Sequence, residues 1–487
     1  MPQAVLDAAL ALHQRENTDL NYKSFGAAEL RTVDSNSFWH CVEDEIEFVN
    51  LAARNHCAAL ATFQQLMSLS DSNALFDAAY GLWRNEIGHN DSASGRLLGV
   101  VNQHLSILVW AAKIISEKSQ RVFDVLHLLE KALPHLLNIR AEEIVAVINA
   151  QYEFTKFDMA RGMIFNAIEL RLQSESQIAW EIWHITRMNM SESMQSLYSA
   201  ALQALMHTDQ QSLALEKARQ DAEDNDPLIA GAALWTMGRA IQTHKLNDCD
   251  LNACVAGLIN KTREAPTEIQ QAAISAVAHA SLKDERLILE LVRLSVEHGD
   301  YTLAVIANFL FMNQQDLLVS SPHFKPLLKS LVGLSPSQEN AIKNFDWLLN
   351  QLYAKSEHRP LVLDCLTEWI IQNGSSSLNN KALIELFDQT IMQIANDQPG
   401  FQAVITRWLV APEKQLAVAI GELIGYLHIH GVKSPTFSPE VLNTFTSQDF
   451  RFLARRLLGY VISEESLLSL TFSLLETDNA QERSFAW

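Results

Sequence analysis

Apolar residues recur every three or four positions along most of the chain, the spacing of a helix with one buried face. Val122, Val125, Leu126, Leu129 and Leu133 follow this spacing. Convincing alternation of apolar and polar residues, as in strands flanked by turn dipeptides, is absent. The pattern therefore predicts an all-α protein of roughly two dozen helices, most of them about 10–18 residues long.

Short polar segments separate the predicted helices. The acidic segment at residues 221–226 is the clearest boundary, and residues 373–377, Asn-Gly-Ser-Ser-Ser, form the most flexible-looking linker. Asp226 suits the N-cap of the following helix, because its carboxylate can accept a hydrogen bond from the first turn. Pro227 suits the first helical position, where no backbone N–H is needed.

A sequence repeat begins after this boundary. Residues 229–238, Ile-Ala-Gly-Ala-Ala-Leu-Trp-Thr-Met-Gly, recur forty positions later as residues 269–278, Ile-Gln-Gln-Ala-Ala-Ile-Ser-Ala-Val-Ala. Each copy is followed by a second apolar helix, and weaker copies continue toward the C-terminus. The pattern resembles the HEAT-repeat family, in which helix pairs of about 40 residues stack side by side. Small residues would let adjacent helices approach closely, so we expect Ala233 and Ala273 to be buried at equivalent places in consecutive pairs.

The predicted organisation has three parts. Residues 1–135 form a helical N-terminal module, residues 136–225 form connecting helical hairpins, and residues 226–487 form a HEAT-like α-solenoid of stacked helix pairs. A chain of 487 residues exceeds what one compact core holds, which agrees with an elongated array. Glycine and proline are scarce, at 17 and 12 copies, which disfavours an all-β fold with its many turns.

Net charge narrows the classes of partner. The formal charge of −20 argues against a general nucleic-acid coat and against binding to an anionic membrane surface. No apolar run reaches the length of a membrane span, and residues 1–16 lack the features of a secretory signal. The sequence therefore predicts a cytoplasmic protein that binds no membrane.

The cysteines and histidines predict no metal site and no cofactor. The five cysteines are odd in number and lie in a long chain, unlike a disulfide framework. Cys249 and Cys254 are separated by four residues, whereas structural zinc sites use tighter pairs and four ligands. Ordinary reduced thiols are the expectation.

One segment carries candidate chemistry. Residues 83–91, Trp-Arg-Asn-Glu-Ile-Gly-His-Asn-Asp, contain Arg84, the polar Asn85 and, four residues beyond Asn85, His89. This resembles the signature of the HEPN superfamily of small helical domains, many of which are metal-independent ribonucleases acting as dimers. Cleavage of RNA through its own 2′-hydroxyl needs an acid or base near neutral pKa and a permanent cation, which histidine and arginine supply. The resemblance implies catalytic roles for Arg84, Asn85 and His89, an RNA substrate and a homodimer.

An arginine followed by a histidine, with four to six residues between them, occurs three more times. The other pairs are Arg121/His127, Arg239/His244 and Arg293/His298, and each lies in a segment predicted to be an ordinary helix. Only Arg84 is followed by asparagine. The alternative interpretation of residues 84–91 is a polar loop whose asparagine and aspartate cap the next helix.

Arg451, Arg455 and Arg456 form a small basic group near the C-terminus. It would hold a phosphate or an acidic partner, or pair with the next helix.

Two functions remain open from the sequence. One is a helical-repeat scaffold that binds a macromolecular partner, a protein before a nucleic acid, within a larger assembly such as a prokaryotic defence system. The alternative is a HEPN-type endoribonuclease with a helical-repeat body, and that resemblance implies a place in a prokaryotic defence system.

Overall fold

The computed structural model describes residues 72–84, 93–102, 105–117, 121–156, 162–297, 299–313, 320–374, 383–429 and 435–475. Within these ranges every regular element is an α-helix or a 3-10 helix and none is a strand, which confirms the predicted all-α class. The chain divides into two compact units between Leu258 and Ile259, inside α14 (Asp248–Glu264). None of the described helices is long and apolar enough to cross a membrane.

The first unit is a series of helices in which each packs on its neighbours one and two places along the chain. Its described elements before α14 are α4 (Ser72–Arg84), α5 (Ala93–Val101), α6 (Ile107–Glu117), α7 (Val122–Ala132), η2 (Leu133–His135), α8 (Ala141–Thr155), α9 (Gly162–Leu172), α10 (Ser176–Met188), α11 (Gln195–Met206), α12 (Gln211–Asp221) and α13 (Pro227–Thr243). Helices α7, α9, α11 and α13 contact one another in that order, and α6, α8 and α10 do the same. The two rows are joined by contacts such as α10 on α11 and α12 on α13.

Helix α11 is enclosed by its neighbours. Every residue from Leu197 to Met206 is buried against α9, α10, α12 and α13. Ser199, Ala200 and Ala204 have small side chains, which let these helices approach closely. A buried polar group needs a partner, and the Gln203 amide nitrogen donates to the carbonyl oxygen of Thr236 at 2.9 Å.

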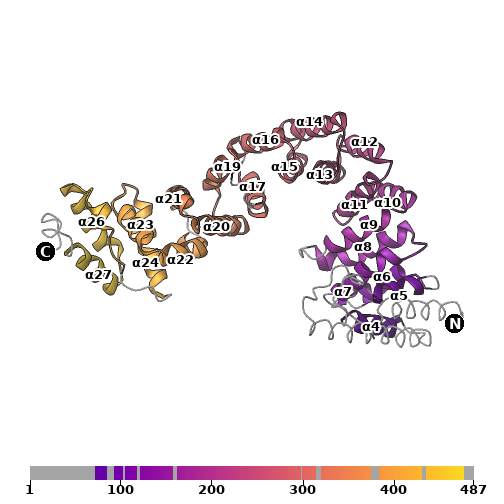
Figure 1. The fold of residues 1–487 in the computed structure, drawn as a ribbon, viewed down its shortest axis with the longest axis horizontal. Helices are drawn as coiled ribbons and strands as arrows, with labels where there is room; N and C mark the ends of the chain where they lie inside the picture. The colour runs from indigo at the N-terminus through magenta and orange to yellow at the C-terminus, as the bar shows by residue number, and fades with distance from the viewer. Residues whose placement is uncertain are drawn as a thin grey trace, which may run out of the picture. The chain divides into compact units, whose positions relative to one another are not determined.

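The second unit continues the same alternation (Figure 1). Its described elements after α14 are α15 (Thr267–Ala280), α16 (Glu285–Glu297), α17 (Asp300–Met312), α19 (Phe324–Ser330), η4 (Leu331–Gly333), α20 (Glu339–Tyr353), η5 (Ser356–His358), α21 (Arg359–Asn373), η6 (Leu383–Phe387), α22 (Asp388–Asn396), α23 (Gln398–Val410), α24 (Lys414–Ile429), α25 (Pro439–Leu442), α26 (Ser447–Tyr460) and α27 (Glu464–Leu475). Helices α15, α17, α20, α22 and α23 contact one another in that order, while α16 contacts α19 and α21 contacts α24. Helix α26, the second-to-last described helix, packs on α23 and α24.

The repeat predicted from the sequence is present. Helix α13 begins at Pro227 and α15 at Thr267, forty positions apart. Asp226 is the N-cap of α13 and its side chain accepts a hydrogen bond from the Leu228 backbone, as predicted. Ala233 and Ala273, each the seventh residue of its helix, are both fully buried. Stacked helix pairs of the HEAT-like kind are therefore confirmed.

Side-chain hydrogen bonds tie each hairpin to the next. In the first unit, Arg171 Nε donates to the Leu136 carbonyl at 2.9 Å, across 35 positions. In the second unit, Trp369 Nε1 donates to the Leu334 carbonyl at 2.9 Å, also across 35 positions. Trp408 Nε1 reaches Thr367 Oγ1 at 2.9 Å across 41 positions. These separations match one helical hairpin, so the bonds join neighbouring repeats.

Two buried carboxylates anchor helices inside the units. In the first unit Asp221, at the end of α12, accepts hydrogen bonds from Trp183 Nε1 at 3.2 Å, Arg187 Nε at 2.7 Å and the Tyr198 hydroxyl at 2.8 Å. Burial is the largest cause that raises the pKa of Tyr198, and the neighbouring Asp221 carboxylate raises it further. The acidic segment predicted as a plain boundary therefore also ties α10, α11 and α12 together.

Glu290 of α16 plays the same part in the second unit. Its carboxylate accepts from Arg263 Nη2 at 2.6 Å, Thr262 Oγ1 at 2.7 Å and Arg293 Nε at 3.0 Å. Burial alone would raise the pKa of Glu290, but the hydrogen bonds from Arg293, Arg263 and Thr262 outweigh it and lower the pKa to about 2. The charged carboxylate is thus strongly held between the end of α14 and α16.

Candidate functional sites

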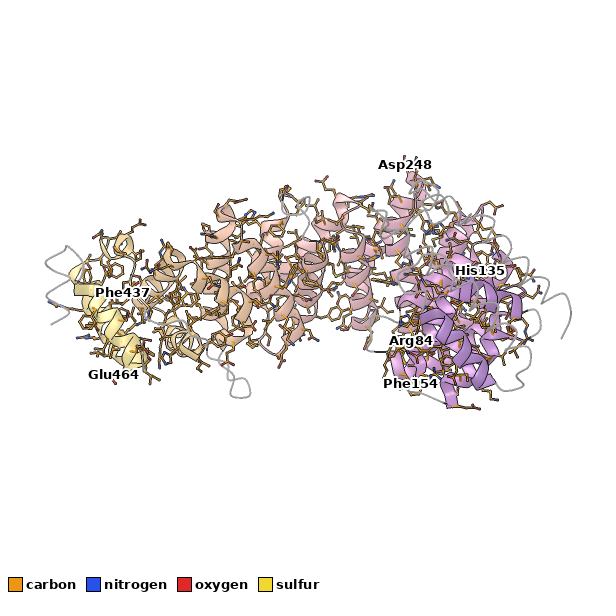
Figure 2. The ribbon with its side chains drawn as sticks, turned by 60° about the horizontal axis from the view of Figure 1, so that its bottom comes forward. Arg84, His135, Phe154, Asp248, Phe437 and Glu464 are labelled. Carbon is orange, nitrogen blue, oxygen red and sulfur yellow. The ribbon has the colours of Figure 1, made fainter. Side chains whose placement is uncertain are left out.

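Arg84 is the last residue of α4 and is exposed, in the position labelled in Figure 2. The described residues contain no hydrogen bond or ion pair made by its guanidinium. Asn85 and His89, the other two residues of the HEPN-like motif, lie outside the described residues. The geometry of a catalytic triplet at this place therefore stays a prediction.

Helix α4 is held by aromatic contacts along its length. The rings of Phe76 and Tyr80 stack at 5.8 Å, and Trp83 stacks on His127 of α7 at 5.1 Å. The Arg121 guanidinium lies 3.8 Å from the centroid of the Phe76 ring, a cation–π contact. These contacts fix the helix that carries Arg84 on the surface of α7.

The other three arginines with the same spacing are used structurally. Arg121 forms ion pairs with Asp77 and Asp124. Arg239 pairs with Glu169 at 3.0 Å, and Arg293 pairs with Glu290. Arg84 differs from them because it makes no such ion pair within the part of the chain that the structure describes.

The Arg239/His244 pair belongs to a polar cluster where α9, α11 and α13 meet. His244 Nε2 lies 2.8 Å from the Gln203 Oε1 atom, and its ring centroid is 4.4 Å from that of His207. Glu169 of α9 lies 3.7 Å from His207 Nε2 and also accepts from Arg239. Burial, the nearby His207 and Arg239 together lower the pKa of His244 to about 4, so it is neutral at pH 7. Such a cluster joins three helices and leaves little charge for a ligand.

The predicted basic group near the C-terminus lies on α26, in the helix group marked by Phe437 and Glu464 in Figure 2. Arg456 is buried and donates to the carbonyl oxygens of Pro412 and Glu413 at 3.0 and 3.3 Å. Its guanidinium also lies 4.4 Å from the centroid of the Phe452 ring. Arg456 therefore stabilises the segment before α24, instead of the helix that follows α26.

Arg451 and Arg455 are exposed on the same helix and have no ion pair among the described residues. Their spacing of four places them on one face of α26. Leu458 lies three positions further along that face and is 76% exposed. We call these three residues, Arg451, Arg455 and Leu458, the α26 stripe.

Large apolar side chains are exposed around the last described helix pair. Ile462, two residues after α26, is 95% exposed, and Phe472 of α27 is 59% exposed. Solenoids normally end in a repeat with a polar outer face. Helical periodicity did not predict the exposure of these residues, although the unbroken run Leu457-Leu458-Gly459-Tyr460-Val461-Ile462 carries more apolar side chains than one helix face can bury.

Metal-binding clusters are absent from the described residues, which contain no group of three or more His, Cys, Asp or Glu side chains able to hold an ion. Cys254 and Cys365 are buried free thiols, and Cys249 is an exposed one. Burial is the main cause that raises the pKa of both buried thiols to about 12. They are therefore neutral and unreactive at pH 7.

No protein-family model matches the chain. No curated protein matches it either. Among solved structures, the chain is similar to one in "Structure of the Pds5-Scc1 complex and implications for cohesin function", with 10% sequence identity and a TM-score of 0.28. The alignment covers 99% of this chain and 92% of that chain. A likeness this distant gives no information on function.

Proposed function

We propose that this chain is a helical-repeat scaffold that binds a protein partner within a larger assembly. The observation that carries the proposal is the exposure of Leu458 in α26 and of Ile462 just after it, at 76% and 95%. Removing apolar area from water stabilises by about 25 cal/mol per Å². Apolar side chains this exposed on a helical array are therefore a natural place for a second protein to pack.

The chemistry of the rest of the chain supports the same function. The two groups of clustered polar side chains at Asp221 and Glu290 are occupied by contacts between helices. Stacked helix pairs present an extended surface built from many repeats, and proteins of this architecture commonly use it for binding. The formal net charge of −20 favours solubility and does not favour the binding of nucleic acid.

The test is site-specific photo-crosslinking in the native cell. A photoreactive residue in place of Leu458 should give a discrete adduct with a different protein, identified by mass spectrometry and reconstituted from purified components. The matched control is the same residue at Arg407, an exposed position on α23. Equal adducts at both positions, or adducts only with a second copy of this chain, would contradict the scaffold proposal.

A second candidate function is a metal-independent endoribonuclease of the HEPN kind, active as a homodimer and serving prokaryotic defence. One observation favours it: among the four arginines that share the Arg–His spacing, Arg84 alone makes no ion pair within the described residues. A cation that no ion pair occupies among the described residues suits the charge that builds on a phosphate during cleavage. The helical-repeat body would then recruit or sense the trigger.

The enzyme candidate has its own test. Arg84→Ala and His89→Ala should each abolish RNA cleavage without loss of fold, and cleavage should persist in a chelator and leave a 2′,3′-cyclic phosphate. Matched controls are His244→Ala and His298→Ala, which share the spacing of the motif. If all the histidine variants behave alike, the motif is a coincidence of composition.

A further inference from the structure

We infer that the α26 stripe binds an acidic amphipathic helix of the partner protein. The inference rests on the proposed scaffold function and adds the chemistry of the segment that is recognised. It joins two observations made on the same helix face: two exposed cations that have no ion pair among the described residues, and an exposed leucine side chain.

The geometry sets the register of such a segment. Arg451, Arg455 and Leu458 stand at positions i, i+4 and i+7 of a straight helix, so their side chains project from one side. Seven positions at 1.5 Å each extend over about 10 Å, or two turns. Phe450, Leu453 and Leu457 of the same helix are buried and hold the opposite side against the array. The stripe is therefore a rigid surface that faces away from the core.

The charge of Arg451 and Arg455 determines which charge the partner carries. Arg456 donates hydrogen bonds to two backbone carbonyls, whereas Arg451 and Arg455 make no ion pair or hydrogen bond in the described part of the chain. Two accessible guanidinium groups form a local positive patch on a protein whose net charge is −20. They favour carboxylates, which guanidinium groups bind with paired hydrogen bonds.

The apolar residues next to the two arginines favour a protein helix over other anionic ligands. Leu458 continues the face of the two arginines, Ile462 is exposed two residues beyond the end of α26, and neither side chain offers a hydrogen bond to a phosphate. Nucleic-acid affinity grows with the number of phosphates neutralised, and two cations on a strongly acidic chain neutralise few. An amphipathic helix with acidic residues beside its apolar stripe matches both ends of the surface.

The probes are three model peptides that share one leucine stripe and differ only in their polar face, which carries Glu, Gln or Lys. Fluorescence anisotropy with the full-length protein should give the order Glu tighter than Gln tighter than Lys, with the preference falling as salt rises. Arg451→Glu combined with Arg455→Glu should weaken binding of the Glu peptide by at least 5-fold and strengthen binding of the Lys peptide. Leu458→Ser should weaken all three peptides alike.

Lys325 and Lys329 provide the matched control, because both are exposed cations four positions apart on α19 of the same unit. Their reversal to Glu should leave the order of the peptides unchanged. The inference is overturned if the order of peptides does not depend on Arg451 and Arg455, or if single-stranded RNA or anionic vesicles bind the stripe in place of the Glu peptide. It is also overturned if the Glu peptide binds only after residues 476–487 are deleted, because this chain's own end would then be the occupant.

The two failures are separable. A heteromeric crosslink at Leu458 without a charge preference among the peptides would leave the scaffold function standing and refute only the acidic helix. Loss of the crosslink itself would refute both.

Discussion

Replacement of Glu290 by Gln tests whether a single buried charge holds α16 in the second unit. Glutamine keeps the shape and one acceptor oxygen of the side chain and removes the charge that Arg263 and Arg293 stabilise. The ordinary pKa is 4.5 and the folded value is about 2, which corresponds to about 3 kcal/mol at 1.36 kcal/mol per pKa unit. Because Arg263 is half exposed, solvent screens part of this energy, and we expect a loss of about 2–3 kcal/mol.

The pH dependence gives the sign of the effect. A carboxylate whose pKa is lower in the folded state stabilises the protein above pH 4.5, and the stabilisation is lost as pH falls toward 2. The difference between the wild type and Glu290→Gln should therefore be largest at neutral pH and shrink below pH 4.5. Hydrogen exchange of α16 measures the local free energy of opening, so it does not require the two units to unfold together.

Glu357→Gln is the matched control, because Glu357 is exposed in the same unit. It should change the exchange of α16 by less than about 0.5 kcal/mol. A loss below about 1 kcal/mol for Glu290→Gln, or a loss that does not shrink in acid, would refute the account of Glu290 as a held charge.

Four further substitutions test the packing and the buried polar groups. Ala233→Leu and Ala273→Leu should each cost about 1–3 kcal/mol by overpacking, measured by urea unfolding, and a neutral result at either site would exclude a tight seam there. His244→Gln should reduce the loss of stability as pH falls from 6.5 to about 4, because the neutral form of His244 is favoured in the fold. After allowance for solvent, we expect this loss to be smaller by about 1–2 kcal/mol. The measurement is a smaller shift of the melting temperature with pH. Asp221→Ala should cost about 1–3 kcal/mol by leaving the buried Tyr198 hydroxyl and the Trp183 indole N–H without their acceptor, and wild-type hydrogen exchange of α12 in this variant would contradict the anchoring role.

The repeat was accessible to sequence reasoning because it depends on local residues. The N-cap at Asp226 and the alanines at positions 233 and 273 act within one helix and its seam, and each fulfils its predicted role. Small residues at a helical period indicate close approach whatever the partner helix is.

The enclosure of α11 could not be predicted in this way. Gln203 and Ser199 suggest a solvent face, yet both are fully buried. The partners of Gln203 are Thr236 and His244, which lie 33 and 41 positions away. The hydrogen-bond partners of such a side chain lie in the next hairpin. From the sequence alone it is therefore predicted to be exposed, because the stacking of the hairpins is not known.

The candidate sites show the same limit. The motif at Arg84 was found by its residue types, and the basic group on α26 by its charge. The structure then separates Arg456, whose carbonyl partners precede α24, from the exposed Arg451 and Arg455. The exposure of Leu458 depends on which helices pack on α26, which helical periodicity alone does not reveal.

The hydrogen bonds that cross 33–41 positions also bear on how the chain forms during synthesis. Each hairpin finds its tertiary partners in the hairpin made just before it, so contacts are short in sequence and the search for them is fast. At about 5–20 residues per second, a ribosome adds the ~40 residues of a repeat in about 2–8 s. The first unit can therefore complete its packing while the second is still being translated, and a stalled ribosome would release a chain that is already folded up to its last full hairpin.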